Sequence, residues 1–158
     1  MSDTGVQQFA DAVEQMPALL AALRAAPRHP AADHPLVPNT PGIYMFSDAG
    51  EPVYVGQSRK LRARLKQHTG AKHGRDQASF AFNVAKREAA DAGVDIKRFR
   101  SLLEGDPEFA SHFDAARASV ARMDVQFIEV PDPIVRTLFE VYAALALDTV
   151  EFNSFETH

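Results

Sequence analysis

The stretch PGIYMFSDAGEPVYVGQSRKLRARLKQH, residues 41–68, contains the strongest structural signal in the chain. Its first half holds two short β-prone runs, residues 42–46 and 53–55. Residues 47–52 between them, SDAGEP, are of the types that form turns. Two such runs around a turn predict a β-hairpin.

The second half of the same stretch predicts a helix. Ser58 is a candidate N-cap, and the helix is expected to run to about His68. Leu61 and Leu65 are four residues apart and are expected to face the core. Arg64 and His68, also four residues apart, share a neighbouring face, where they would border the sheet without being buried in it.

Hydrophobic periodicity and turn signals predict the elements outside this stretch. Apolar residues recur every three or four positions in residues 6–23, which predicts a helix. Residues 27–41, rich in Pro and His, predict a linker or an extended cover. Further helices are expected at residues 79–92 and 107–121, and a strand within residues 120–130.

The last predicted helix has a clear start. Asp132 and Pro133 are typical of an N-cap and a first helical position, and the helix would end near Leu147. Its buried stripe is expected to consist of Ile134, Leu138, Val141, Tyr142 and Leu145. The order of elements predicts an α/β (α+β) fold, with a three-stranded sheet surrounded by helices.

Composition and charge limit the classes of protein. A chain of 158 residues with 46% hydrophobic and 24% charged residues is typical of one globular domain. We expect no membrane span, because no apolar stretch of about 18 residues occurs, and a cytoplasmic location, because residues 1–8 do not resemble a secretion signal. The absence of cysteine excludes thiolate metal sites and thiolate nucleophiles.

The net charge of -4 argues against a protein that coats nucleic acid, yet the charge is unevenly distributed. Between residues 59 and 75 there is no acidic residue. The same segment has seven basic residues, Arg59, Lys60, Arg62, Arg64, Lys66, Lys72 and Arg75. Such a segment could neutralise several backbone phosphates; a solvated basic helix face gives the same pattern.

Two pairs of side chains could carry chemistry near the hairpin. Side chains alternate between the faces of a strand, so an apolar-to-apolar register would place Tyr44 and Tyr54 on one face. The structural alternative is a cross-strand packing pair. Arg64 and His68 are likewise compatible with an ordinary helix surface.

Glu140 is unusual because it lies inside the apolar run of residues 137–147. Ala143 and Ala144, one turn further on, are small and leave space around its carboxylate. The alternative is an exposed Glu140 paired with Arg136, an interaction worth less than about 1 kcal/mol.

Taken in order, these residues match a known pattern. Gly42-Ile43-Tyr44, followed after nine residues by Tyr54-Val55-Gly56, closely resembles the signature of the GIY-YIG nuclease family, with Val in place of the central Ile. The resemblance continues through Gln57, Ser58, Leu61, Arg64 and His68, and is completed by Glu140 and by Asn153. It implies a small antiparallel sheet flanked by helices.

The resemblance does not cover the whole chain. It extends over about residues 40–68 and 123–155. Residues 1–38 would then form an N-terminal helix and linker, and residues 39–158 the nuclease domain. Within that domain, residues 70–120 would be an unusually long helical insertion.

The resemblance also implies functional roles. Catalytic roles fall on Tyr44, Tyr54, Arg64, His68, Glu140 and Asn153, with Glu140 as the sole metal-binding carboxylate for one Mg²⁺ or Mn²⁺ ion. The substrate would be DNA, cut to leave a 5′ phosphate and a 3′ hydroxyl. Contacts with nucleic acid are expected from Gly56, Gln57, Ser58, Arg59, Lys60, Arg62, Lys66, Lys72 and Arg75. Gln57 departs from the family's DNA-repair branch, which commonly has lysine there.

Two alternatives to a nuclease remain open at this point. The chain could be a silent module that has kept the fold and lost catalysis. It could also be a protein adaptor that acts through the helices between residues 79 and 121. Independently of these, the helix at residues 6–23 has nearly coiled-coil spacing, so it could pair two chains in a homodimer or pack on its own domain.

Overall fold

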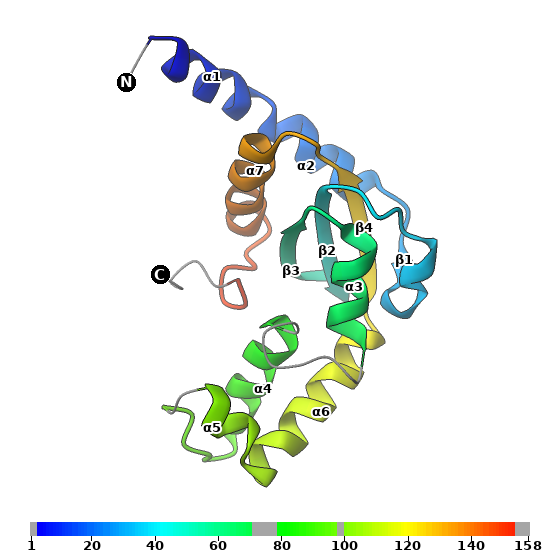
Figure 1. Cartoon of the computed structure of the whole chain (residues 1–158), viewed down its shortest axis with the longest axis vertical. Coiled ribbons are helices and arrows are strands. Elements are labelled where there is room, and N and C mark those ends of the chain that lie inside the picture. Colours follow the sequence, from blue (N-terminus) through cyan, green and yellow to red (C-terminus); the bar gives the residue numbers. More distant parts are fainter. Residues whose placement is uncertain (1–2, 71–78, 98–99, 154–158) are drawn as a thin grey trace.

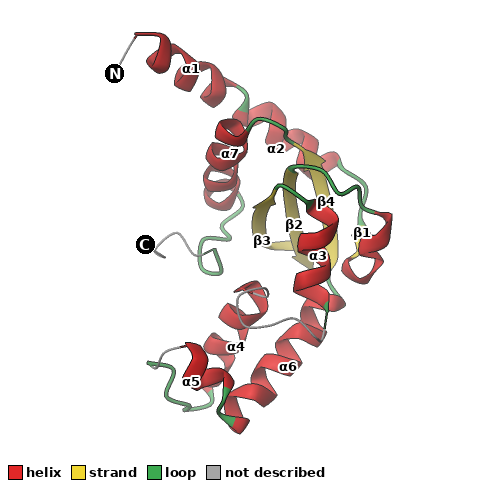
Figure 2. Ribbon diagram, viewed as in Figure 1, coloured by secondary structure: helices red, strands yellow, loops and turns green. Residues whose placement is uncertain are grey.

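The structure of the chain, a computed structural model, describes residues 3–70, 79–97 and 100–153 (Figure 1). The elements are α1 (Asp3–Glu14), α2 (Met16–Ala25), β1 (His29–Pro30), η1 (Ala31–Leu36), β2 (Gly42–Asp48), β3 (Glu51–Ser58), α3 (Leu61–Thr69), α4 (Ser79–Asp91), α5 (Arg100–Glu104), α6 (Pro107–Ala121), β4 (Asp124–Glu129) and α7 (Pro133–Ala146). Figure 2 shows a small antiparallel sheet surrounded by helices, which confirms the predicted fold class. None of the described helices is long and apolar enough to cross a membrane.

The predicted hairpin is confirmed. Strands β2 and β3 pair antiparallel, with Asp48 opposite Glu51. The turn is therefore only two residues, Ala49 and Gly50, and both have positive φ, 50° and 85°. Two-residue turns with this backbone match the twist of the flanking strands. Glycine adopts such a conformation without steric cost, which explains its place in the turn.

The sheet has four strands in the order β1-β4-β2-β3, rather than the three that were predicted. The additional strand is His29–Pro30, which pairs with Val125 and Asp124 of β4. It lies within residues 27–41, which were predicted to be a linker or cover. A proline is tolerated here because β1 is an edge strand, where one side needs no ladder hydrogen bond.

Helices cover both faces of the sheet. Tyr44, Phe46 and Tyr54 on one face belong to a core that includes residues of α3, α4 and α6. Ile43 and Val55 on the other face belong to a second core with residues of α1, α2 and α7. The alternation expected from the sequence is thus confirmed, and the strand β2 is buried from both sides.

The start of α7 was predicted correctly and its buried face was not. Asp132 is the N-cap, and its carboxylate accepts hydrogen bonds from the backbone N–H groups of Ile134 and Val135. The buried residues are Val135, Arg136, Phe139, Ala143 and Ala144, whereas Ile134 and Leu145 are 64% and 67% exposed. Because apolar residues occur all around this helix, periodicity alone did not identify the face that packs on the sheet.

Two other helix boundaries differ from the predictions. Ser58 belongs to β3, and its hydroxyl accepts a hydrogen bond from the Lys60 N–H, so α3 begins at Leu61 with Lys60 at the N-cap. The predicted helix at residues 6–23 is two helices, with a break at Gln15. Proline in the first turn of α2 explains the break, because it cannot continue a helix from the preceding turn.

The predicted helical insertion is helical where it is described. The two predicted helices are α4 and α6, and α5 was not predicted. Phe82 of α4 packs edge-to-face against Phe109 and Phe113 of α6, with ring centroids 5.4 and 5.9 Å apart. This small aromatic core is formed between the inserted helices themselves.

Candidate active site

A buried tyrosine–histidine pair lies where α3 crosses the sheet. The Tyr44 hydroxyl and His68 Nε2 are 2.8 Å apart, and both side chains are almost fully buried, at 1% and 0% exposure. Arg64 Nε lies 3.4 Å from the same hydroxyl and donates to it. The prediction that His68 would stay unburied at the border of the sheet is wrong. Leu61, Leu65 and His68 form one i, i+4, i+7 stripe that faces the core.

Gly56 allows the Tyr44 ring to lie where it does. Gly56 is opposite Tyr44 in the hairpin. A Cβ atom at position 56 would overlap the Tyr44 ring and its hydroxyl. The second glycine of the signature is therefore required here by a close approach between neighbouring strands.

Tyr54 lies on the same face as Tyr44, as the alternation predicted, with ring centroids 6.1 Å apart. Its ring stacks on Phe80 of α4, with centroids 4.5 Å apart and planes 12° apart. The inserted helix thus contributes a wall of the site. Sequence reasoning missed Phe80, because it lies outside the resemblance and only the tertiary structure brings it to Tyr54.

Exchanging Phe80 for leucine is expected to change the surroundings of Tyr54, because stacking of this kind is worth about 0.5–1.5 kcal/mol beyond area burial. Phe82→Leu is the matched control, since Phe82 on the same helix packs against α6. The chain has three tyrosines and no tryptophan, so the part of its near-ultraviolet circular dichroism at wavelengths longer than the phenylalanine bands reports on tyrosine. The tyrosine band should change in Phe80→Leu and stay unchanged in Phe82→Leu. Equal bands in the two variants would contradict the proposed packing role.

Glu140 of α7 is half-buried and held from β3. Its Oε2 accepts a hydrogen bond of 2.6 Å from Gln57 Nε2. Gln57 Oε1 in turn accepts one of 3.3 Å from Arg136 Nε. Glu140 is thus linked to Arg136 through Gln57, and is not the exposed partner of a direct pair that one interpretation of the sequence suggested.

Burial sets the protonation of this site. It raises the pKa of Tyr44 well above 10, with a further contribution from Tyr54, against the lowering effect of Arg64. It lowers the pKa of His68 to about 3, with a smaller contribution from the Arg64 charge. Burial also raises the pKa of Glu140, which the Gln57 hydrogen bond and Arg64 oppose. Tyr44 and His68 are therefore both neutral near pH 7.

The buried neutral histidine predicts acid sensitivity. In the unfolded chain His68 takes up a proton near pH 6.5, whereas burial lowers its pKa in the folded chain to about 3. The contribution of neutral His68 to folding stability is therefore complete above pH 6.5 and is lost as the pH falls below it. The His68 share of the loss is at most about 1.4 kcal/mol per pH unit. Urea unfolding between pH 7 and 5 should show a shallower decline for His68→Gln than for the parent. Equal slopes would refute the assignment.

Asn153 links the segment that follows α7 to the hairpin by hydrogen bonds. Its Oδ1 accepts hydrogen bonds from Thr149 Oγ1, at 3.1 Å, and from the Val55 N–H, at 3.4 Å. Its Nδ2 donates to the Val55 carbonyl. Val55 adjoins Tyr54 and Gly56, so these bonds hold the second signature strand in place.

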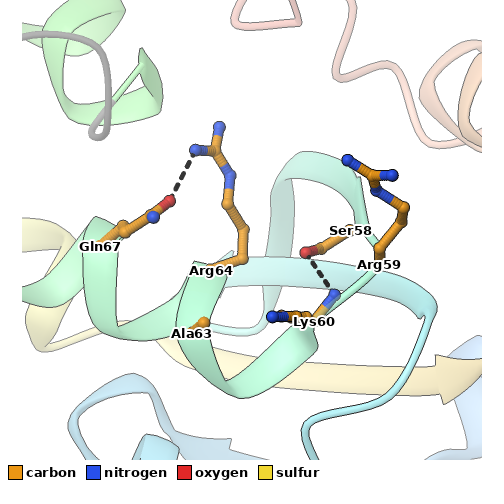
Figure 3. A pocket seen from close by; sticks show the side chains of 6 residues that line it. All are labelled: Ser58, Arg59, Lys60, Ala63, Arg64 and Gln67. Atoms are coloured by element: carbon orange, nitrogen blue, oxygen red, sulfur yellow. Dashed lines mark hydrogen bonds between the residues drawn. The ribbon is translucent and has the colours of Figure 1, made fainter.

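The basic residues of α3 and the loop before it divide into groups. An open hollow of about 520 Å³ is lined by Ser58, Arg59, Lys60, Ala63, Arg64 and Gln67. Figure 3 shows the Arg59 and Arg64 guanidinium groups projecting to the same side, with Arg64 Nη1 donating to Gln67 Oε1 at 3.0 Å.

The remaining basic residues lie elsewhere. Arg62 Nε donates a hydrogen bond to the Val37 carbonyl. The Lys66 charge contributes, after burial, to lowering the pKa of His34. Arg62 and Lys66 therefore lie toward η1 and the loop that follows it. The predicted contacts at Lys72 and Arg75 lie outside the described residues.

No protein-family model matches the chain. UvrABC system protein C of Deinococcus radiodurans is 44% identical to it over 45 residues, covering 27% of this chain and 7% of the relative. The same protein of Thermus thermophilus is 43% identical over 75 residues, or 47% of this chain and 11% of the relative. The chain therefore matches only a small part of the length of these relatives.

One solved structure is a point mutant of the GIY-YIG N-terminal endonuclease domain of UvrC from Thermotoga maritima, bound to a catalytic divalent cation. It is 15% identical with a TM-score of 0.41, covering 77% of this chain and 91% of that chain. Local identity above 40% to UvrC accompanies a hairpin that brings the GIY and YVG runs side by side. Part of this chain is therefore similar in sequence to UvrABC system protein C, and its hairpin holds the residues that resemble the GIY-YIG signature.

Proposed function

We propose that this chain is a metal-dependent endonuclease that hydrolyses phosphodiester bonds of DNA. The observation that supports it is the grouping of Tyr44, Arg64 and Glu140. Arg64 donates to the Tyr44 hydroxyl, and its charge also lowers the pKa of Glu140. A base, a cation for the phosphate and a metal-binding carboxylate are the groups that hydrolysis of a phosphodiester requires.

Glu140 would hold the metal ion. No group of three or more His, Cys, Asp or Glu side chains gathers anywhere in the described residues, so Glu140 would bind the ion as a single carboxylate. This donor set fits Mg²⁺ or Mn²⁺, hard ions that keep several of their waters. The ion would supply Lewis-acid stabilisation of the departing 3′ oxygen.

Arg64 would bind the non-bridging oxygens of the scissile phosphate. Its planar guanidinium suits two oxygens at once. It lines the hollow together with Arg59 and Lys60, which would contact neighbouring phosphates. The attack of water on phosphorus and the departure of the 3′ oxygen would leave a 5′ phosphate and a 3′ hydroxyl.

Tyr44 would act as the general base. As a phenol at neutral pH, it can accept a proton from water only while it passes its own proton to a second base. His68 Nε2, 2.8 Å away, is within reach of that proton. A phosphate bound to Arg64 would add negative charge beside His68, which favours the imidazolium form.

A labelled DNA duplex tests this function in two steps. With chelator present, fluorescence anisotropy should show binding that weakens steeply between about 50 and 200 mM salt. Added Mg²⁺ or Mn²⁺ should then produce fragments that end in 5′ phosphate and 3′ hydroxyl. Binding without cleavage on duplex DNA, single-stranded DNA and RNA would identify a silent module. Absence of binding at low salt would favour the protein adaptor.

A further inference from the structure

The amide of Gln57 lies between two residues of α7 that are one helical turn apart, Arg136 and Glu140. Its oxygen accepts from Arg136 Nε at 3.3 Å, and its nitrogen donates to Glu140 Oε2 at 2.6 Å. We propose that Gln57 and Arg136 are positioning residues that fix the Glu140 carboxylate so that Oε1 is the oxygen presented to the metal ion. This inference rests on the proposed function, in which Glu140 binds the ion.

The neighbours of Gln57 determine which way its amide points. A guanidinium has only donors and an ionised carboxylate only acceptors. The amide oxygen must therefore face Arg136, and the amide nitrogen must face Glu140. Rotation of the amide by 180° would set like groups against each other on both sides. Gln57 is consequently locked in the orientation that occupies Oε2.

Arg136 is itself held firmly. It is buried, and its Nη1 donates to the carbonyls of Val130 and Pro131, at 3.0 and 3.3 Å, in the loop that leads into α7. The guanidinium is thus anchored on backbone that precedes the helix by only a few residues. Because the guanidinium is fixed in this way, its Nε donates to Gln57 from a constant position. The loop before α7 thereby restrains Gln57, and Gln57 restrains Glu140.

A single metal-binding carboxylate depends strongly on hydrogen bonds that fix its orientation. Glu140 would be the single protein carboxylate on the ion, so its rotation would not be limited by a second ligand residue. Residues that hydrogen-bond to a metal ligand typically account for about 10–100-fold in metal affinity or activity when they are removed.

Binding of Mn²⁺ without nucleic acid tests the inference, for example by electron paramagnetic resonance of the free ion. Gln57→Met keeps the length of the side chain and loses the hydrogen bonds of the amide to Arg136 and Glu140, together with a longer one of 3.5 Å to Thr137 Oγ1. Its Mn²⁺ dissociation constant should rise about 10-fold. The same exchange in Gln8→Met, on the exposed face of α1, should leave the constant unchanged. Unchanged or tighter binding by Gln57→Met would overturn the proposal.

A double-mutant cycle tests the order of the two residues. If Arg136 acts through Gln57, Arg136→Met should weaken Mn²⁺ binding in the parent and have little further effect in Gln57→Met. Additive effects would overturn the part assigned to Arg136. Circular dichroism shows whether Arg136→Met folds, and Gln57→Met tests the carboxylate contact without it.

Glu140→Gln separates failure of this inference from failure of the proposed function. If Glu140→Gln binds Mn²⁺ as tightly as the parent, the metal site itself is wrong. If Glu140→Gln loses Mn²⁺ while Gln57→Met retains it, the metal site stands and only the positioning role is refuted.

Discussion

Glu140→Gln is expected to lower the rate of DNA cleavage by at least about 10³-fold, because it removes the charge that would hold the metal ion. The amide has nearly the shape of the carboxylate, so the fold should be retained. Glu140 is half-buried, and burial raises its carboxyl pKa, so folding disfavours the charged form. Removal of the charge is therefore not expected to destabilise the fold. Single-turnover cleavage at saturating protein measures the rate.

Glu14→Gln on the exposed surface of α1 is the matched control and should cleave at the parental rate. Cleavage by Glu140→Gln within tenfold of the parent would show that the essential carboxylate lies elsewhere. Restoring activity to Glu140→Gln by raising Mn²⁺ a hundredfold would still agree with a weakened metal site.

Tyr44→Phe has the second largest expected effect, a loss of about 10²–10⁴-fold in the rate of cleavage, which is the usual contribution of a general base. The variant keeps the ring against Gly56 and removes only the hydroxyl. It also leaves His68 Nε2 without its partner, which is expected to cost about 1–3 kcal/mol of folding stability. The rate must therefore be measured under conditions in which circular dichroism shows a folded chain.

Tyr142→Phe on α7 is the control, because it removes the same atom from a half-buried tyrosine outside the proposed site. Mn²⁺ binding should be unchanged in Tyr44→Phe, since the hydroxyl is not proposed as a ligand. A variant that cleaves as fast as the parent would eliminate Tyr44 as the base and leave another group to activate the water.

Local signals predicted much of the fold. The hairpin could be predicted because β-prone runs, a turn and alternation all lie within 17 residues, from Gly42 to Ser58. The start of α7 could be predicted because Asp132 directly precedes Pro133, and the Asp132 carboxylate accepts hydrogen bonds from the first backbone N–H groups of the helix. The strand β1 could not, since two residues carry no periodicity and pair with β4 almost a hundred residues away.

The candidate site was accessible from the sequence only in part. Alternation placed Tyr44 and Tyr54 on one face, and helical spacing placed Arg64 and His68 on another. The burial of His68 depends on how α3 lies across the sheet, which spacing does not specify. The stacking of Phe80 on Tyr54 joins segments that are far apart in the chain. The same is true of the link from Arg136 through Gln57 to Glu140. No local sequence pattern predicts contacts of this kind.

A metal-dependent endonuclease must cut DNA only while a divalent ion is available to it. The most direct measurement is nicking of supercoiled plasmid by the unaltered chain with Mg²⁺ or Mn²⁺, with chelator, and after the metal is restored. We expect conversion of the plasmid to open circles with metal, no conversion with chelator, and recovery when the metal is added again. Nicking that persists in chelator, or no nicking with either metal, would contradict this expectation.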